Sequence, residues 1–311
     1  VTDVSVNLAI DVAATNNIGH MVLSTGLQSE AFTKNHLDLP DMAYVGVGIF
    51  SGAALNDSLD GGGGNDSLTG NGGVGLSIHG PVRVATERTL FAMPETAIGL
   101  FPDVGGSWFL PRLPGGIGYY LALTGARLKA TDCRYAGIAT HFVPSERLAE
   151  VVTALEKARW GDGLAGAVAA LRPFTAHPGE AGLLAGQRPQ IDRCFADKDS
   201  VEAVIAALEA EKSPWGEETL ATLAKRSPTS MKVAFEQLKQ GAALDFDGCM
   251  VMEYRLAQRA MLKGSDFFEG IRAVLVDKDH APKWQPATLA DVGADRVAAF
   301  FAPLGKDDLT F

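Results

Sequence analysis

The sequence predicts an α/β protein that ends in a largely helical region. Between residues 74 and 143, short apolar segments of strand length alternate with segments of helical spacing. After residue 145 the helical pattern dominates, and helices are expected over 146–158, 163–171, 179–185, 199–210, 216–225, 229–240, 246–262 and 265–276. With 47% hydrophobic residues, the 311-residue chain can bury a sizeable core.

The first quarter of the chain gives weaker signals. Residues 7–12 and 42–50 have the apolar and β-branched content of short strands. Residues 56–64 and 65–73 are two similar nonapeptides that resemble the calcium-binding repeats of RTX β-rolls, and they offer Asp57 and Asp66 as weak calcium candidates. Stacked repeats need about three units, and two are present. A glycine-rich loop without metal is therefore the preferred interpretation.

The middle of the chain gives clearer boundaries. A helix over 117–124 should end at Gly125, and Thr131 is expected to cap the next helix, which ends at Gly137. The remaining elements expected here are a helix over 74–79 and strands over 82–85, 90–93 and 138–143.

Four residues between positions 72 and 103 could form a reaction site. Gly72 and Gly73 open an apolar run, where the lack of a Cβ lets backbone amides approach a ligand oxygen. Such amides can stabilise an oxyanion. Glu95 and Asp103 each follow a proline in turn-rich sequence, where loops present side chains. Amides and a carboxylate pair together favour acyl chemistry on a carbonyl compound.

Several long motifs resemble the crotonase (enoyl-CoA hydratase/isomerase) superfamily. The stretch MPETAIGLFPDVGGS, residues 93–107, is most similar to the 3-hydroxyisobutyryl-CoA hydrolase branch. The similarity continues in order through residues 109–113, 123–128, 136–143, 227–230, 252–255 and 277–284. The resemblance implies a crotonase-type ββα spiral core, incomplete at the N-terminus, with a helical C-terminal region. The implied division is a divergent segment 1–55, a nonapeptide loop 56–73, a crotonase-like core 74–225 and a helical region 226–311.

The resemblance also implies an activity, which is hydrolysis of a short β-hydroxyacyl-CoA thioester as in valine breakdown. Glu95 would attack the thioester carbonyl or activate water against it, and Asp103 would hold the substrate hydroxyl and assist proton transfer. One oxyanion amide would come from Gly72 or Gly73. Coenzyme A would enter as part of the acyl-CoA substrate, and no separate cofactor is expected.

Two features bear on how the substrate would be held. Relatives carry an alanine-glycine-glycine-aspartate loop that supplies another oxyanion amide, and here only Ser51–Ala54 echoes it. The C-terminal segment in relatives lies near the coenzyme A nucleotide, so Arg272, Lys278 and Lys283 are candidates for phosphate contacts. A solvated helix face is the alternative for these cations.

Three other interpretations stay open. Within the superfamily, hydration or isomerisation of an enoyl-CoA would leave coenzyme A on the product. A non-catalytic, calcium-binding protein could retain part of the fold. Residues 70–75 also fit the dinucleotide pattern G-x-G-x-x-G with Glu95 downstream, but no buried strand precedes them, which argues against that site.

Charge and hydropathy limit the partners. The net charge of −10 argues against nucleic acid or an anionic membrane as partner. No apolar run approaches the roughly 20 residues of a membrane span, and residues 1–17 do not form a signal peptide as written. The sequence thus predicts a cytoplasmic protein, and a homo-oligomer stays possible. His79 and His141 lie in apolar runs and are expected to be hydrogen-bonded structural histidines.

Overall fold

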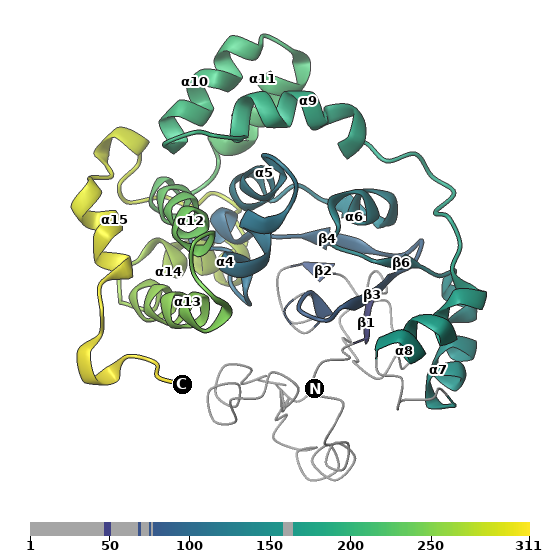
Figure 1. Cartoon of the computed structure of the whole chain (residues 1–311). Helices are drawn as coiled ribbons and strands as arrows, with labels where there is room; N and C mark the ends of the chain where they lie inside the picture. Colours follow the sequence, from purple (N-terminus) through teal and green to yellow (C-terminus); the bar gives the residue numbers. More distant parts are fainter. Residues whose placement is uncertain (1–46, 51–67, 70–74, 76, 158–163) are drawn as a thin grey trace.

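Two small sheets lie at the centre of the molecule, with helices around them (Figure 1). The computed structural model describes residues 47–50, 68–69, 75, 77–157 and 164–311. One sheet has the order β1-β3-β6, and the other has the order β2-β4-β5. The strands are β1 (Val47–Phe50), β2 (Leu68–Thr69), β3 (Val82–Ala85), β4 (Leu90–Ala92), β5 (Leu128–Lys129) and β6 (His141–Phe142).

The pairing within the sheets is mostly parallel. In the first sheet β3 lies between β1 and β6 and is parallel to both, with Val84 opposite Ile49 and His141. In the second sheet β4 pairs in parallel with β2 and antiparallel with β5. Val82, Val84 and Ala85 are all buried, because helices and loops cover this short strand. Parallel strands need crossover connections, which fits the predicted α/β class.

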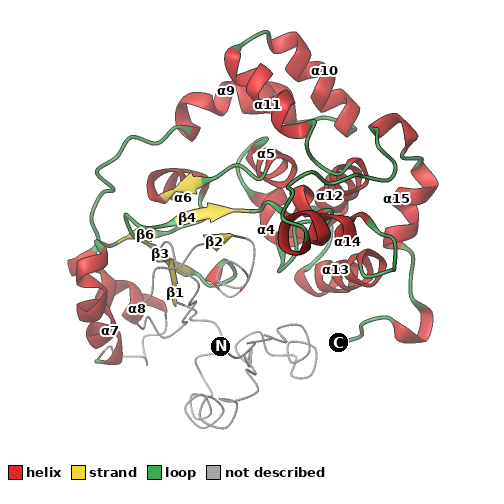
Figure 2. Ribbon diagram, turned by 180° about the vertical axis from the view of Figure 1, so that it is seen from behind, coloured by secondary structure: helices red, strands yellow, loops and turns green. Residues whose placement is uncertain are grey.

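The helices surround the sheets on several sides (Figure 2). α9, α10 and α11 form a layer beyond α5, whereas α7 and α8 lie at the opposite end of the sheets from α12, α13, α14 and α15. The α-helices are α4 (Gly106–Phe109), α5 (Ile117–Thr124), α6 (Ala130–Ala136), α7 (Leu148–Glu156), α8 (Leu164–Leu171), α9 (Leu184–Phe195), α10 (Val201–Glu211), α11 (Pro214–Leu223), α12 (Pro228–Gly241), α13 (Phe246–Ala260), α14 (Asp266–Ile271) and α15 (Ala294–Phe301).

Short helical turns connect these elements. The 3-10 turns are η1 (Glu95–Ile98), η2 (Leu110–Arg112), η3 (Ser145–Arg147), η5 (Arg172–Phe174), η7 (Leu289–Asp291) and η8 (Gly305–Asp307), and η6 (Arg272–Val276) is a π-helical turn. The largest core cluster joins Phe91 and Met93 near β4 to Leu121 on α5 and Phe195 on α9. Two smaller clusters lie under α7 and α8 and between α12, α13 and α15.

Most predicted elements of the middle and C-terminal parts are confirmed. α5 ends at Gly125 as expected, with the glycine amide donating to the Leu121 carbonyl at 2.9 Å. β3 matches the predicted strand, and β4 matches all but Met93 of the other. The predicted C-terminal helices 229–240 and 246–262 correspond to α12 and α13, which begin at side-chain caps from Ser227 and Asp245.

Three predictions need correction, and one helix was not predicted. The helix predicted over 179–185 is instead α9, Leu184–Phe195. Pro189 lies inside it, and because proline disfavours a helix interior, the sequence pattern did not indicate a helix there. The sequence analysis expected no helix beyond residue 276, yet α15 forms over Ala294–Phe301. Thr131 does not cap α6, since Lys129 occupies the N-cap and the Thr131 hydroxyl donates to the Glu180 carbonyl. The strand predicted over 138–143 is reduced to His141–Phe142.

The N-terminal predictions are covered only in small part. β1 falls within the strand expected over 42–50. The strand expected over 7–12 lies outside the described residues, as do the nonapeptides apart from β2. Of the helix expected over 74–79, Gly75 and Ser77 are helical and the chain turns at Ile78–His79. The domain boundaries therefore stay a prediction.

Candidate functional site

The first candidate carboxylate, Glu95, opens the turn η1 directly after β4. β4 ends at Ala92, and two residues later the Pro94 carbonyl accepts the Ala97 amide at 2.8 Å, which starts the turn. Glu95 is only 3% exposed. Its Oε2 atom is buried and has no hydrogen-bond partner among the described residues. A buried carboxylate oxygen without a partner is costly, so its retention points to a functional role.

The second candidate, Asp103, lies in a tight turn that leads into α4. The Asp103 carbonyl accepts a hydrogen bond from the Gly106 amide at 2.8 Å. Val104 and Gly105 follow with φ angles of +50° and +86°. Positive φ is unfavourable for a β-branched residue such as Val104, whereas Gly105 adopts it freely. Within the described part of the chain, Asp103 Oδ1 is another buried oxygen without a partner.

Burial and the charges of neighbouring carboxylates raise the pKa of both carboxyls and favour their protonated forms. The pKa of Glu95 is raised well above its ordinary value, first by burial and then by the nearby charge of Asp103. The pKa of Asp103 is raised to about 7 by burial and by the charge of Glu253. Among the described residues, no lysine or arginine forms an ion pair with these carboxylates. A close carboxyl pair of this kind shares protons and can act as acid and base.

Glu253 on α13 is a third buried carboxylate that the sequence analysis did not select. Its Oε2 accepts the Gly105 amide and its Oε1 the Ser107 amide, each at 2.9 Å, and the Ser107 hydroxyl also donates to Oε1. The signal was present in the sequence. Glu253 shares the buried face of α13 with Cys249, Met252, Leu256 and Ala260, at spacings of three or four residues. A charged residue on an apolar helix face needs a buried partner.

The predicted oxyanion glycines, Gly72 and Gly73, lie outside the described residues. Gly75, two residues further on, contacts the Asp103 turn. A Cβ atom at Gly75 would lie 2.5 Å from the Cβ of Val104, so only glycine permits this approach. The segment that follows the glycine pair therefore abuts the turn that carries Asp103.

The candidate phosphate contacts lie in a different environment. Arg272 forms ion pairs with Glu269, Asp277 and Asp279 at 2.6–2.8 Å, which occupy its guanidinium. The Lys283 amide donates to Glu269, in the same cluster. Lys278 has a positive φ of 55° in the adjoining loop. Three carboxylates beside these cations lower the local attraction for a phosphate.

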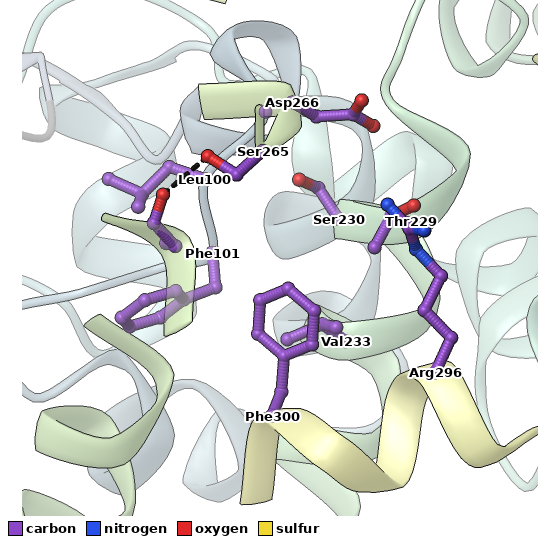
Figure 3. Close-up of a pocket in the computed structure, with 11 residues that line it drawn as sticks. Leu100, Phe101, Thr229, Ser230, Val233, Ser265, Asp266, Arg296 and Phe300 are labelled. Atoms are coloured by element: carbon purple, nitrogen blue, oxygen red, sulfur yellow. Dashed lines mark hydrogen bonds between the residues drawn. The ribbon is translucent and has the colours of Figure 1, made fainter. Parts of the chain in front are cut away.

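A small cavity lies behind η1, where α12, α14 and α15 meet (Figure 3). Its volume of about 20 Å³ suits a single water molecule and is far too small for an acyl group. Val233 of α12 and Phe300 of α15 line its apolar side, and Ser230 and Asp266 lie on its polar side. The Thr229 hydroxyl there is buried and has no protein partner in the described structure.

The described residues offer neither a metal site nor a membrane span. In the described residues, no group of three or more His, Cys, Asp or Glu side chains is arranged to hold a metal ion. The weak calcium candidates Asp57 and Asp66 lie outside that part. The helices that the structure describes are all too short or too polar to cross a bilayer.

Comparison with known sequences gives a consistent result. Residues 68–301 match the sequence profile of the family described as enoyl-CoA hydratase/isomerase. The mitochondrial 3-hydroxyisobutyryl-CoA hydrolases of Mus musculus and Homo sapiens are each 47% identical over 243 residues, which cover 77% of this chain. The protein of that name from Xenopus tropicalis is 48% identical over 248 residues, or 76% of this chain. The chain spans 62% of the length of these three relatives.

Two solved structures share the fold. A carnitinyl-CoA dehydratase from Mycobacterium thermoresistibile is 42% identical, with a TM-score of 0.69 over 78% of this chain and 67% of that chain. An enoyl-CoA hydratase from Rhodobacter sphaeroides is 38% identical, with a TM-score of 0.68 over 78% of this chain and 68% of that chain.

Proposed function

The chain belongs to the enoyl-CoA hydratase/isomerase family, as the sequence predicted, and from this premise we propose that it hydrolyses a short β-hydroxyacyl-CoA thioester. The observation that carries the proposal is the carboxyl pair of Glu95 and Asp103, each with a buried, unpartnered oxygen and neither with a counter-ion in the described structure. The names of the relatives, 3-hydroxyisobutyryl-CoA hydrolase, support the same reaction and substrate class.

Glu95 could promote hydrolysis of the thioester in two ways. Its carboxylate can attack the carbonyl carbon, so that the C–S electrons leave with sulfur, which gains a proton as the coenzyme A thiol. Water then cleaves the resulting anhydride and restores the carboxylate. Alternatively, Glu95 takes a proton from a water molecule that attacks the carbonyl directly. Both routes consume one water and give a hydroxy acid and a thiol.

Asp103 supports either route from the other side of the pair. Its raised pKa of about 7 allows the carboxyl to hold a proton near neutral pH and release it during the reaction. The partner-free Oδ1 atom is available to a substrate hydroxyl. A β-hydroxy group on the acyl chain is the substrate feature that would use this contact.

The developing negative charge on the thioester oxygen needs hydrogen-bond donors. The sequence assigns one donor to the amides at Gly72 and Gly73, and this assignment stays a prediction. The contact between Gly75 and Val104 supports it, because it brings the following segment against the Asp103 turn. Loss of one such donor typically lowers the rate by about 10²–10³-fold.

Hydration or isomerisation of an enoyl-CoA is the second candidate. It is favoured by the two solved structures, which are named as a dehydratase and a hydratase and share 42% and 38% identity with this chain. A carboxyl pair can also deliver a proton and a hydroxide to a double bond. The difference lies in the product, which keeps coenzyme A in hydration and loses it in hydrolysis.

The experiment is a thiol-release assay on 3-hydroxyisobutyryl-CoA and 3-hydroxypropionyl-CoA, beside a hydration assay on an enoyl-CoA. We expect thiol release from the hydroxyacyl substrates and little hydration. Hydration without thiol release would favour the second candidate. If a folded protein did neither, the non-catalytic interpretation would replace both.

Compartment and assembly belong to the proposal as well. The sequence predicts cytoplasm, and the vertebrate relatives are named as mitochondrial. A homo-oligomer is compatible with the proposed reaction. Fractionation of the native cells and light scattering of the purified chain would decide these two points.

A further inference from the structure

The turn between Asp103 and α4 is unfavourable by itself. Val104 and Gly105 are consecutive left-handed residues, and Val104 is β-branched. The left-handed conformation of Val104 is strained and persists only when its surroundings hold it. The turn must therefore be fixed by contacts from other elements.

Glu253 holds the turn from the side of α13. Its two carboxylate oxygens accept the amides of Gly105 and Ser107 at 2.9 Å and the Ser107 hydroxyl. The contact spans 146–148 residues of sequence. Other helices in the structure, such as α10 and α12, take their caps from the serine at their own N-cap position. α4 has Gly105 at that position and no side-chain cap of its own.

His79 holds the turn from the other side. Its Nε2 atom lies 3.1 Å from the Val104 carbonyl, and because a carbonyl only accepts, Nε2 must carry the hydrogen. The ring packs edge-on against Phe109 and Phe246, with centroids 6.3 and 5.0 Å away. Burial lowers the pKa of His79, so the ring is neutral near pH 7. A Cβ atom at Gly105 would lie 2.2 Å from Nε2, which shows how closely ring and turn fit.

We propose that Glu253 and His79 are positioning residues that clamp the turn and thereby hold the Asp103 carboxyl against Glu95. The inference rests on the proposed function for its kinetic part and on the turn geometry alone for its structural part. Neither residue touches the substrate in this account. Each acts on Asp103 through the backbone of Val104, Gly105 and Ser107.

The electrostatics argue against a purely structural cap. Glu253 is 8% exposed, and its charge raises the pKa of Asp103 and, to a smaller extent, that of Glu95. A neutral serine or asparagine would cap α4 without adding a third buried negative charge. A carboxylate accepts at both oxygens, which lets one side chain bind two backbone amides at once. Rigid placement of the turn is what this arrangement adds.

The test uses Glu253→Gln in the full chain. Glutamine has one carbonyl oxygen, so its amide nitrogen must face either the Gly105 or the Ser107 N–H, and one of the two hydrogen bonds is lost. Two readouts are measured, which are hydrogen exchange at these two amides and the kcat and KM of thiol release. We expect exchange to rise at least about tenfold and kcat to fall about 10–100-fold, with KM changed less than threefold.

Asp132→Asn is the matched control. Asp132 is also buried, at 6% exposure, and accepts one backbone amide, from Leu184 at 2.8 Å. It lies on α6, away from the Asp103 turn. We expect this variant to lower the melting temperature as a buried acid-to-amide change does, while kcat falls less than threefold and exchange at Gly105 and Ser107 stays as in the wild type.

His79→Leu tests the clamp from its other side and replaces Glu253→Gln if that variant does not fold. It should raise exchange at Gly106, whose amide closes the turn, and lower kcat more than it raises KM. A folded variant with faster exchange and wild-type kcat would reduce both residues to structural supports. Unchanged exchange would overturn the clamp. If the wild type released no thiol, the proposed function would fail, and exchange alone would still decide the clamp.

Discussion

Two clusters of three carboxylates in this chain show opposite electrostatics. Glu95 and Glu253 are buried, Asp103 is half-buried with its Oδ1 atom shielded from solvent, and no ion pair compensates them in the described structure. The other cluster surrounds Arg272 at the surface, where Glu269, Asp277 and Asp279 pair with its guanidinium. The residue types are the same. Burial and the presence of a cation are what differ.

The difference appears in the pKa values. Around Arg272, hydrogen bonds and ion pairing lower the pKa of Glu269 to about 2 and also lower that of Asp279. In the core, burial and repulsion raise the pKa of Glu95, and they raise that of Asp103 to about 7. A surface carboxylate with a cation stays ionised and serves structure. A buried pair without one can exchange protons near neutral pH, which is what acid–base chemistry requires.

The largest effect is expected at Glu95. Glu95→Gln keeps the side-chain shape and removes the nucleophile or base, so thiol release should fall at least about 10³-fold. The measurement is kcat/KM on a hydroxyacyl-CoA, with circular dichroism to check the fold. Release at the wild-type rate would remove Glu95 from the mechanism and end the functional contrast between the two clusters.

Asp103→Asn should have the next largest effect. Loss of its proton transfer should lower kcat about 10²-fold. Because the Asp103 charge raises the pKa of Glu95, its removal should also move the acid limb of the pH–rate profile to lower pH. A profile whose acid limb stays in place, or moves upward, would show that the two carboxyls are not electrostatically paired.

The carboxyl cluster of Glu95, Asp103 and Glu253 should destabilise the folded protein to a degree that depends on pH. When the pKa of a carboxyl is higher in the folded than in the unfolded protein, the free energy of unfolding falls as pH rises between the two pKa values. For Asp103 these values are 3.8 and about 7. Asp103→Asn should therefore raise the melting temperature at pH 8 and change it little at pH 4. Thermal unfolding at both pH values checks this. A variant that is less stable at pH 8 would contradict the account.

Substitution in the surface cluster around Arg272 should have the smallest effect on stability and activity. Arg272→Gln breaks exposed ion pairs, so the melting temperature should fall slightly, and the difference from the wild type should shrink in high salt. Since three carboxylates already occupy the guanidinium, KM for an acyl-CoA should rise less than threefold. A rise above tenfold would instead support the phosphate contact that the sequence predicts for Arg272.

The sequence predicted the family, the α/β class and the approximate boundaries of α5, α12 and α13, because helical spacing, glycine stops and long colinear motifs are local signals. It did not predict α9, since Pro189 lies inside that helix.

Of the candidate site, the sequence selected Glu95 and Asp103, whose neighbours form one continuous motif. It missed Glu253, because that contact joins residues almost 150 positions apart. Hydrogen bonds of this range depend on the packing of α13 against α4, which no local pattern encodes.

The most direct test of the central claim needs no substrate. Carbon-13 NMR of the carboxyl groups, titrated from pH 3 to 9, can be assigned by comparing the wild type with Glu95→Gln and Asp103→Asn. The carboxyl of Asp103 should titrate near pH 7, and that of Glu95 should titrate well above the ordinary 4.5. If both signals titrated near pH 4, like surface carboxylates, the buried and uncompensated pair would not exist and the proposed chemistry would lose its basis.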